Sequence, residues 1–157
     1  VSTHLIRLQC HTAEEFRRKL WSLDEVHRWK ATEFRKFLLY FGLVVLRDHM
    51  PGPYYHRPLK LDVAITILAN PRLYLEKNQT AEELLLLFVQ EAGSLYGCGI
   101  YVYNIHSLVH LAADARQHGC LDSCSAFPFE SHLGQINKLV HSGHRPLEQI
   151  IRRTAEG

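Results

Sequence analysis

The stretch YNIHSLVHLAADARQHGCLDSCSAFPFESHLGQINKLVHSGHR, residues 103–145, decides the fold that we expect. Its first half predicts a helix that begins at Asn104, a good N-cap residue, and ends at Gly119, because apolar residues recur between them at helical spacing. Its second half predicts a helix that follows Pro128, carries an apolar stripe and ends at Gly143. The stretch therefore predicts two helices joined by a short turn.

Polar side chains lie at defined places in both predicted helices. His106, His110 and Asp114 are four residues apart, which places them on one face of the first helix. Imidazoles with this spacing can bind a metal, with the carboxylate as a ligand or as a partner of a ligand. We favour a structural or auxiliary polar seam, packed against neighbouring helices near Glu130 without a metal, because no further Cys or His pair has matching spacing. Glu130 itself opens the second helix, where a carboxylate is either a helix-end device or a catalytic ligand.

The composition favours one globular domain over the whole chain, residues 1–157. These residues are 46% hydrophobic and 22% charged, and their number suffices for a sizeable core. The net charge of +2 is too small to indicate nucleic acid on its own. No run reaches the roughly 18 apolar residues of a membrane span, and no signal-peptide pattern is present. We therefore expect an intracellular protein without a membrane partner.

The cysteines are few and irregularly spaced, as is typical of reduced intracellular thiols. They are Cys10, Cys98, Cys120 and Cys124. The last two lie four residues apart across a turn, where a zinc site with His118 is a weaker alternative.

The rest of the chain predicts more helices, so we expect an all-α bundle of six to eight helices. Residues 1–20 form a poorly defined segment with a short solvated helix at 11–20. Capping boxes that begin at Ser22 and Thr80 predict helix starts close to each. Further helices are expected at 32–47, at 59–68 and after Pro146, and a short strand is an alternative for 100–103.

Two apolar patterns predict the core. The run of residues 84–89 is apolar on all sides, so we expect it to be the most buried part of the chain, with Leu87 inside. The helix at 32–47 is expected to bury one aromatic and aliphatic face, made of Phe34, Phe37, Leu38, Phe41 and Val45.

Basic residues cluster at 17–19, 28–36 and 145–153. Solvated helix faces explain these clusters better than a nucleic-acid footprint does, because the net charge is low.

Five motifs resemble a known family when they are taken in order. They are SLDEVHRWKATEFRKFLLYFGLVVL (22–46), AITIL (64–68), AEELLLLFV (81–89), YNIHSLVHL (103–111) and SAFPFESHLG (125–134). With these motifs the chain resembles the C-terminal half of transposase-derived proteins related to the CACTA (En/Spm) class of cut-and-paste elements. Lys60 and Asp62 depart from the family pattern, which has apolar or small residues at their positions.

The resemblance implies an RNase H-like catalytic core, in which three carboxylates hold two Mg²⁺ or Mn²⁺ ions for DNA strand cleavage. It places Glu130 as the third acid and metal ligand, residues 22–97 as a helical insertion, and residues 103–157 as the late helices of the core. The two other acids and the strands would precede Val1, and the first residue is not Met, so we expect a fragment. Such a fragment would be inactive alone and would hold no cofactor.

The same resemblance implies DNA at transposon ends as a partner, together with the missing N-terminal half, and a nuclear location. A homo-oligomer is a further expectation. The candidates for contact with the DNA backbone are Lys138, Arg145, Arg152 and Arg153. The alternative function is a helical interaction or dimerisation module that was repurposed from a transposon.

Overall fold

The computed structural model describes residues 1–8 and 21–155. The all-α prediction is confirmed, because 78% of the structure is helical and the described residues contain no strand. The helix predicted at 11–20, the basic run at 17–19 and Cys10 lie outside the described residues. The chain divides into two compact units, Val1–Cys124 and Ser125–Gly157, where the sequence predicted one domain.

The N-terminal segment is helical where the sequence predicted a poorly defined chain. Leu5 in the first helix is fully buried and packs with Trp29 and Val45 in a small core. This burial explains the helix, since seven residues alone are too few to be stable in water. The elements of this part are α1 (Ser2–Leu8), η2 (Leu23–Arg28), α2 (Ala31–Lys36), η3 (Phe37–Phe41) and α3 (Gly42–Arg47).

The helix start predicted near Ser22 is confirmed, although η2 is a 3₁₀-helix. The Ser22 hydroxyl accepts a hydrogen bond from the Asp24 backbone N–H, with 3.2 Å between Oγ and N. The helix predicted at 32–47 is also present, as α2, η3 and α3 in succession. Its central segment, η3, is a π-helix, in which the Gly42 N–H donates to the carbonyl of Phe37. Such a segment is wider than an α-helical turn.

The face of this helix differs from the prediction at one position. Phe34 is exposed, whereas its neighbour Glu33 is buried. Glu33 tolerates burial because its carboxylate accepts a hydrogen bond from the Lys30 backbone N–H at the start of α2. A charged side chain that is satisfied at a helix end can thus replace an apolar one.

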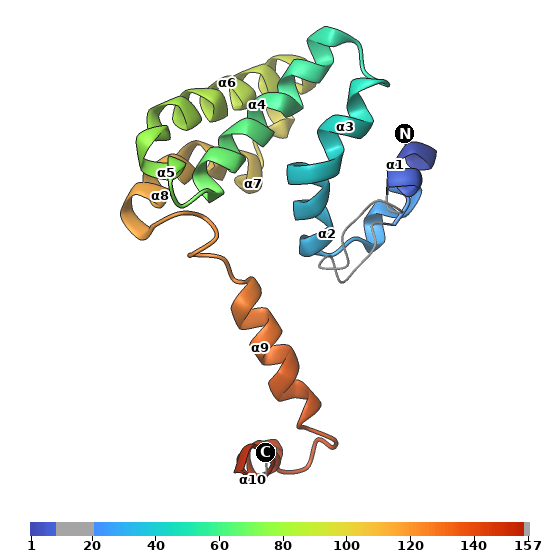
Figure 1. Ribbon diagram of the computed structural model, residues 1–157, viewed down its shortest axis with the longest axis vertical. Helices are drawn as coiled ribbons and strands as arrows, with labels where there is room; N and C mark the ends of the chain where they lie inside the picture. The colour runs from blue at the N-terminus through green and yellow to red at the C-terminus, as the bar shows by residue number, and fades with distance from the viewer. Residues whose placement is uncertain (9–20, 156–157) are drawn as a thin grey trace. The chain divides into compact units, whose positions relative to one another are not determined.

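Two long helices, α4 and α6, form the centre of Val1–Cys124 and run side by side (Figure 1). α4 begins earlier than predicted, because Pro53 in its first turn supplies a fixed helical φ, and it continues through Pro58. α6 begins at Asn78 rather than after Thr80. The bounds are α4 (Gly52–Ala69), α5 (Leu73–Glu76) and α6 (Asn78–Tyr96).

The prediction that Leu87 is a core residue is wrong. Its side chain is 45% exposed, whereas Leu85 is fully buried two residues earlier. The buried residues of α6 recur at helical spacing on one face, and they include Ala81, Leu85, Val89 and Ala92. α4 and α8 cover only this face, so the apolar residues on the other side stay at the surface.

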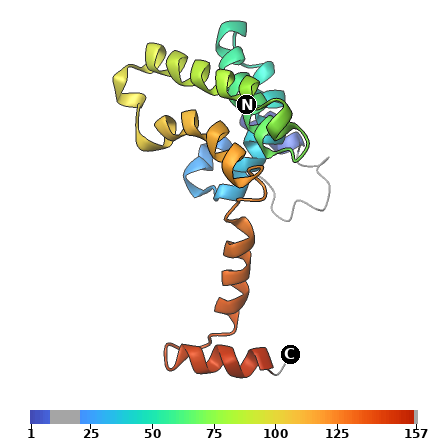
Figure 2. The same cartoon turned by 90° about the vertical axis from the view of Figure 1, so that its left-hand side faces the viewer.

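After α6 the chain turns and returns along it, as Figure 2 shows. The helix that we predicted from Asn104 is present, but it begins earlier, with Val102 as its N-cap, and it replaces the strand considered for 100–103. Gly119 ends it as predicted, with a φ of 101° that favours glycine. The elements are η4 (Cys98–Ile100), α7 (Tyr103–His106), η5 (Ser107–His110) and α8 (Leu111–His118).

The main core lies where α4, α6 and α8 meet. Its fully or nearly fully buried members are Ala64, Leu68, Ala81, Leu85, Ala112 and Ala115. Alanine at four of these six positions lets the helix backbones approach closely. Asn78 adds a polar link, because its side-chain N–H groups donate to the carbonyls of Tyr74 and Ala112.

The unit Ser125–Gly157 contains α9 (Phe127–Lys138) and α10 (Pro146–Ala155). The start of each helix agrees with the sequence prediction, but α9 ends at Lys138 rather than at Gly143. Its end is fixed by the tight turn in which the Leu139 N–H donates to the carbonyl of Ile136. Over the described residues, no helix of the structure is both long and apolar enough to cross a membrane.

Candidate functional site

Glu130 lies in the first turn of α9 and is exposed to solvent. The turn is held by other groups, because Ser125 Oγ accepts a hydrogen bond from the Phe127 N–H and the Ala126 carbonyl accepts one from the Glu130 N–H. Within the described part of the chain, the Glu130 carboxylate itself has no hydrogen bond or ion pair. It is therefore available to an outside group, although its position also complements the positive end of the helix dipole.

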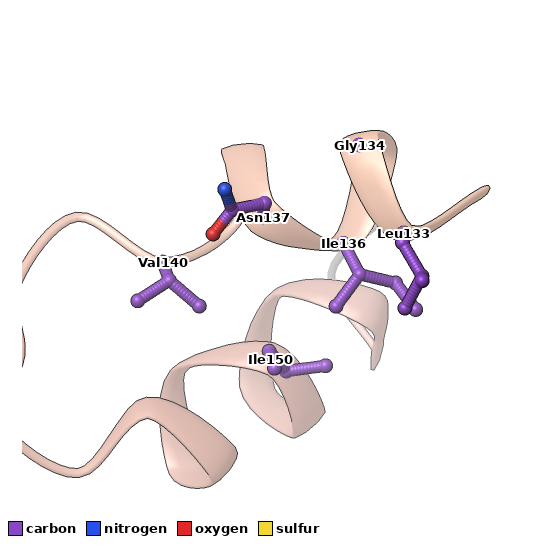
Figure 3. A pocket seen from close by; sticks show the side chains of 6 residues that line it. All are labelled: Leu133, Gly134, Ile136, Asn137, Val140 and Ile150. Atoms are coloured by element: carbon purple, nitrogen blue, oxygen red, sulfur yellow. The ribbon is translucent and has the colours of Figure 1, made fainter. Parts of the chain in front are cut away.

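An apolar stripe runs along α9 beside Glu130. Leu133, Ile136 and Val140 lie toward Ile150 of α10 (Figure 3). They line an open groove of about 380 Å³ between the two helices, together with Gly134 and Asn137. α10 covers only part of this stripe.

Within the described part of this unit, no neighbour buries the N-terminal half of the stripe. Phe129 is 72% exposed and Leu133 is 63% exposed. Burying an apolar side chain of this size stabilises a protein by roughly 1.5–3 kcal/mol, so these two residues on one helix face contribute none of that stability as long as they stay exposed.

The position of Glu130 relative to this stripe follows from helix geometry. Successive residues are rotated by about 100°, so Glu130 lies about 60° around the helix from Leu133. Asn137 and Gly134 follow on the same side of the stripe as Glu130. No atom lies within 4 Å of the place where a Cβ of Gly134 would stand. A surface that packed on the stripe would thus leave Glu130 at its edge, with room for a close approach beside it.

The histidines of the predicted polar seam come from α7 and η5, and their rings meet edge to face with 5.3 Å between ring centroids. His106, His110 and Asp114 share one face, as predicted. All three are exposed, so the expected packing of both histidines against neighbouring helices is corrected. α8, which continues η5, buries Ala112 and Ala115 in the core. The polar face with His106, His110 and Asp114 therefore points to solvent.

The turn with Cys120 and Cys124 is held by hydrogen bonds. The Cys124 thiol donates to the carbonyl of His118, with 3.0 Å between Sγ and O, and Cys120 is buried. The Leu121 N–H donates to the carbonyl of Leu68, which ties the turn to α4.

The four basic residues proposed for DNA contact differ in their surroundings. Lys138 is exposed at the end of α9, and Arg145 forms an ion pair with Glu148. Arg153 is half-buried and donates a hydrogen bond to the carbonyl of Leu139, so it caps the end of α9. Arg152 is exposed on α10.

Gln149, which no sequence pattern singled out, organises the loop between α9 and α10. Its side-chain oxygen accepts a hydrogen bond from the His141 N–H, and its side-chain nitrogen donates to Ser142 and to the carbonyl of His144. A glutamine inside a helix has no sequence pattern that reveals such contacts to a preceding loop.

No metal site is complete in the described chain. Among the described residues, no three side chains of His, Cys, Asp or Glu lie close enough together to hold an ion. Mg²⁺ or Mn²⁺ prefers several oxygen ligands, so Glu130 would supply one ligand and the others would have to come from elsewhere.

Comparisons with protein-family models, with curated proteins and with solved structures find no match to this chain.

Proposed function

We propose that this chain is a segment of a transposase-derived protein, and that Glu130 on α9 is the third acid of its DNA-cleaving core. The observation that carries the proposal is the combination of an exposed, unpaired carboxylate with an uncovered apolar stripe beside it. A helix that packs on the strands of an RNase H-like core needs such a stripe. Its catalytic acid must lie at the edge of the packed surface, where solvent and DNA reach it.

The helices before residue 97 bear on the same proposal. α4 and α6 bury their apolar residues against each other and against α8, so this core contains no strand among the described residues. Because α8 belongs to the late helices, the proposed insertion would pack directly on the late part of the catalytic core. DNA at transposon ends is the proposed substrate, and the nucleus is the proposed location.

Glu130 has a defined chemical part in this proposal. A carboxylate is a hard oxygen ligand, and divalent ions supply water activation and leaving-group stabilisation in phosphodiester cleavage. The other acids would come from residues outside this chain. The chain alone would therefore leave DNA intact.

The test combines this chain with the N-terminal half of the catalytic domain of a CACTA-related transposase. We expect cleavage of a labelled transposon-end duplex in Mg²⁺ or Mn²⁺, and loss of that cleavage in Glu130→Gln. Glu148→Gln is the control, because Glu148 is also an exposed acid in the first turn of a helix of this unit, although it differs from Glu130 in forming an ion pair with Arg145. Full cleavage by the Glu130→Gln variant would overturn the assignment.

A second function, a dimerisation module, is favoured by one observation on α10. Leu147 is 72% exposed and Ile151 is 70% exposed, and they lie four residues apart on one face. Sedimentation velocity decides this alternative. The dimerisation module would be favoured over the nuclease segment by two results together. The chain would sediment as a dimer that Leu147→Glu dissociates, and Glu130→Gln would have no effect in the cleavage assay.

A further inference from the structure

A small cavity lies between α3, η3 and α4 of the first unit. Its volume is about 40 Å³. The wall is apolar except for one carboxylate, and the lining residues are Phe37, Leu38, Gly42, Leu43, Leu46, Pro58 and Asp62. Gly42 is buried, but the other lining residues are half-buried, so the cavity reaches the surface.

The carboxylate of Asp62 lacks a partner among the residues that the structure describes. Its Oδ1 atom is buried, and no group among the described residues donates a hydrogen bond to it. Burial raises the pKa of Asp62 above its ordinary value of 3.8. An acceptor that is buried without a donor costs stability, so it marks a place where a donor is missing.

The cations of α4 do not pair with the Asp62 carboxylate. The positions three and four residues from Asp62 on α4 hold Pro58, Leu59, Ile65 and Thr66, none of which is basic. Two cations of α4 precede Asp62, Arg57 by five residues and Lys60 by two, and both form ion pairs with Glu91 of α6. The cavity therefore combines an acceptor that lacks a partner among the described residues with walls that are mostly apolar.

The π-helix shapes one wall of the cavity. The hydrogen bond from the Gly42 N–H to the Phe37 carbonyl spans five residues, and it draws the Phe37 ring against Gly42. A Cβ at position 42 would lie 2.7 Å from the Phe37 carbonyl oxygen, so only glycine fits there. π-helical segments occur frequently at functional sites, because they place side chains where an α-helix cannot.

We propose that this cavity binds a primary ammonium group carried on an unbranched aliphatic stem. A water-sized group occupies about 10–15 Å³, so the cavity holds about three such groups in a row, which matches an ammonium and two methylenes. The carboxylate of Asp62 accepts from the ammonium, and the apolar wall contacts the methylenes. A guanidinium fits less well, because its five N–H donors in a planar fork need more acceptors than one carboxylate.

Such an ammonium group has two sources, a lysine side chain and a free alkylamine, and the experiment separates them. Propylammonium chloride and Nα-acetyl-lysine methylamide are titrated into the ¹⁵N-labelled chain at constant ionic strength and pH 7.5. The readout is the shift of the Gly42 and Leu43 amide resonances. We expect dissociation constants on the order of 1–10 mM, which is reasonable for so few contact atoms. Binding of either probe that depends on Asp62 supports the site, and the tighter probe identifies the source.

Neutral probes and two variants test whether the carboxylate is responsible. 1-Propanol and Nα-acetyl-norleucine methylamide match the two probes in shape, and we expect them to bind about tenfold or more weakly, because hydrogen bonds to a charged group are strong. Asp62→Asn removes the charge, and Leu46→Phe fills the cavity while Asp62 stays. Both are expected to abolish binding.

The control variant is Asp114→Asn, an exposed acid on α8 of the same unit, which should bind as the unchanged chain does. Equal shifts from propylammonium and 1-propanol, unchanged binding by Asp62→Asn, or no saturable shift with any probe would overturn the proposal. In the last case the cavity holds an ordered water only.

Discussion

In Val1–Cys124 the apolar faces of α4, α6 and α8 meet one another, whereas in Ser125–Gly157 the apolar faces of α9 and α10 stay largely exposed. In the first unit some large apolar side chains, such as Leu68 and Leu85, are fully buried. In the second unit, no residue whose side chain is described is buried. Helices of similar pattern thus differ in burial. Those of the first unit make a core of their own, whereas those of the second leave most of their apolar side chains exposed among the described residues.

The largest effect expected from this comparison is at Leu85 of α6. Leu85→Ala should lower the free energy of unfolding by about 2–5 kcal/mol, because it opens a cavity in a closely packed core. Leu87→Ala makes the same chemical change on the exposed side of the same helix, and about 0.5 kcal/mol or less is expected. Urea denaturation followed by circular dichroism measures both. Equal losses would contradict the assignment of the buried face.

A smaller effect is expected at the polar link in that core. Asn78→Ala removes the donors to the carbonyls of Tyr74 and Ala112, and it should cost about 1–3 kcal/mol because a buried acceptor is left without a donor. Gln79→Ala is the control, since Gln79 is exposed and next in sequence. If both variants unfold at the same urea concentration as the unchanged chain, the link carries no stability.

The carboxylate of Asp62 in the first unit is half-buried, whereas that of Glu130 in the second unit is exposed. The pKa of Asp62 is raised by burial, so the folded chain binds more protons than the unfolded chain as the pH rises above 3.8. Stability is therefore lost with rising pH across this window, up to the raised pKa. We expect Asp62→Asn to unfold at a higher urea concentration than the unchanged chain at neutral pH. This difference should shrink below pH 4, and a difference that does not depend on pH would argue against the burial of this group.

The smallest effect is expected at the helix starts of the second unit. Glu130→Gln should cost only about 0.3–1 kcal/mol in the chain alone, because this acid only complements the helix dipole there. Glu148→Gln should cost a similarly small amount, because its further contact, the ion pair with Arg145, is exposed and such pairs contribute little. Thermal melting of α9 and α10 measures both variants. A large loss in Glu130→Gln alone would mean that Glu130 has a structural partner within the chain.

Helical periodicity predicted most of the elements but not the direction in which each one faces. The run at 84–89 is apolar all round, so its sequence does not show that Leu85 faces the core and Leu87 faces solvent. The buried face is determined by the side of α6 that α4 and α8 cover. The capping pattern at Ser22 and the proline at the start of α9 located these two helix starts well, because both signals are local. Thr80 failed as a cap because Asn78, two residues earlier, is drawn into the core by a distant carbonyl.

The candidate site shows the same division between local and distant causes. Pro128 and the apolar spacing were enough to place Glu130 in the first turn of a helix. The exposure of His106 and His110 was not predictable from their spacing, because a polar face looks alike in sequence whether it meets water or another helix. The cavity at Asp62 arises from a π-helix and a second helix together, and a departure from the family pattern was its only sequence signal.

The most direct test of the central claim is hydrogen exchange of α6 and α9 in one experiment. It is carried out on the chain alone and on the chain mixed with the N-terminal half of the catalytic domain of a CACTA-related transposase. We predict that α6 is protected in both samples, and that the amides of α9 around Leu133 become protected only in the mixture, because the missing strands then cover its stripe. Strong protection of α9 in the chain alone, or no change on mixing, would contradict the account.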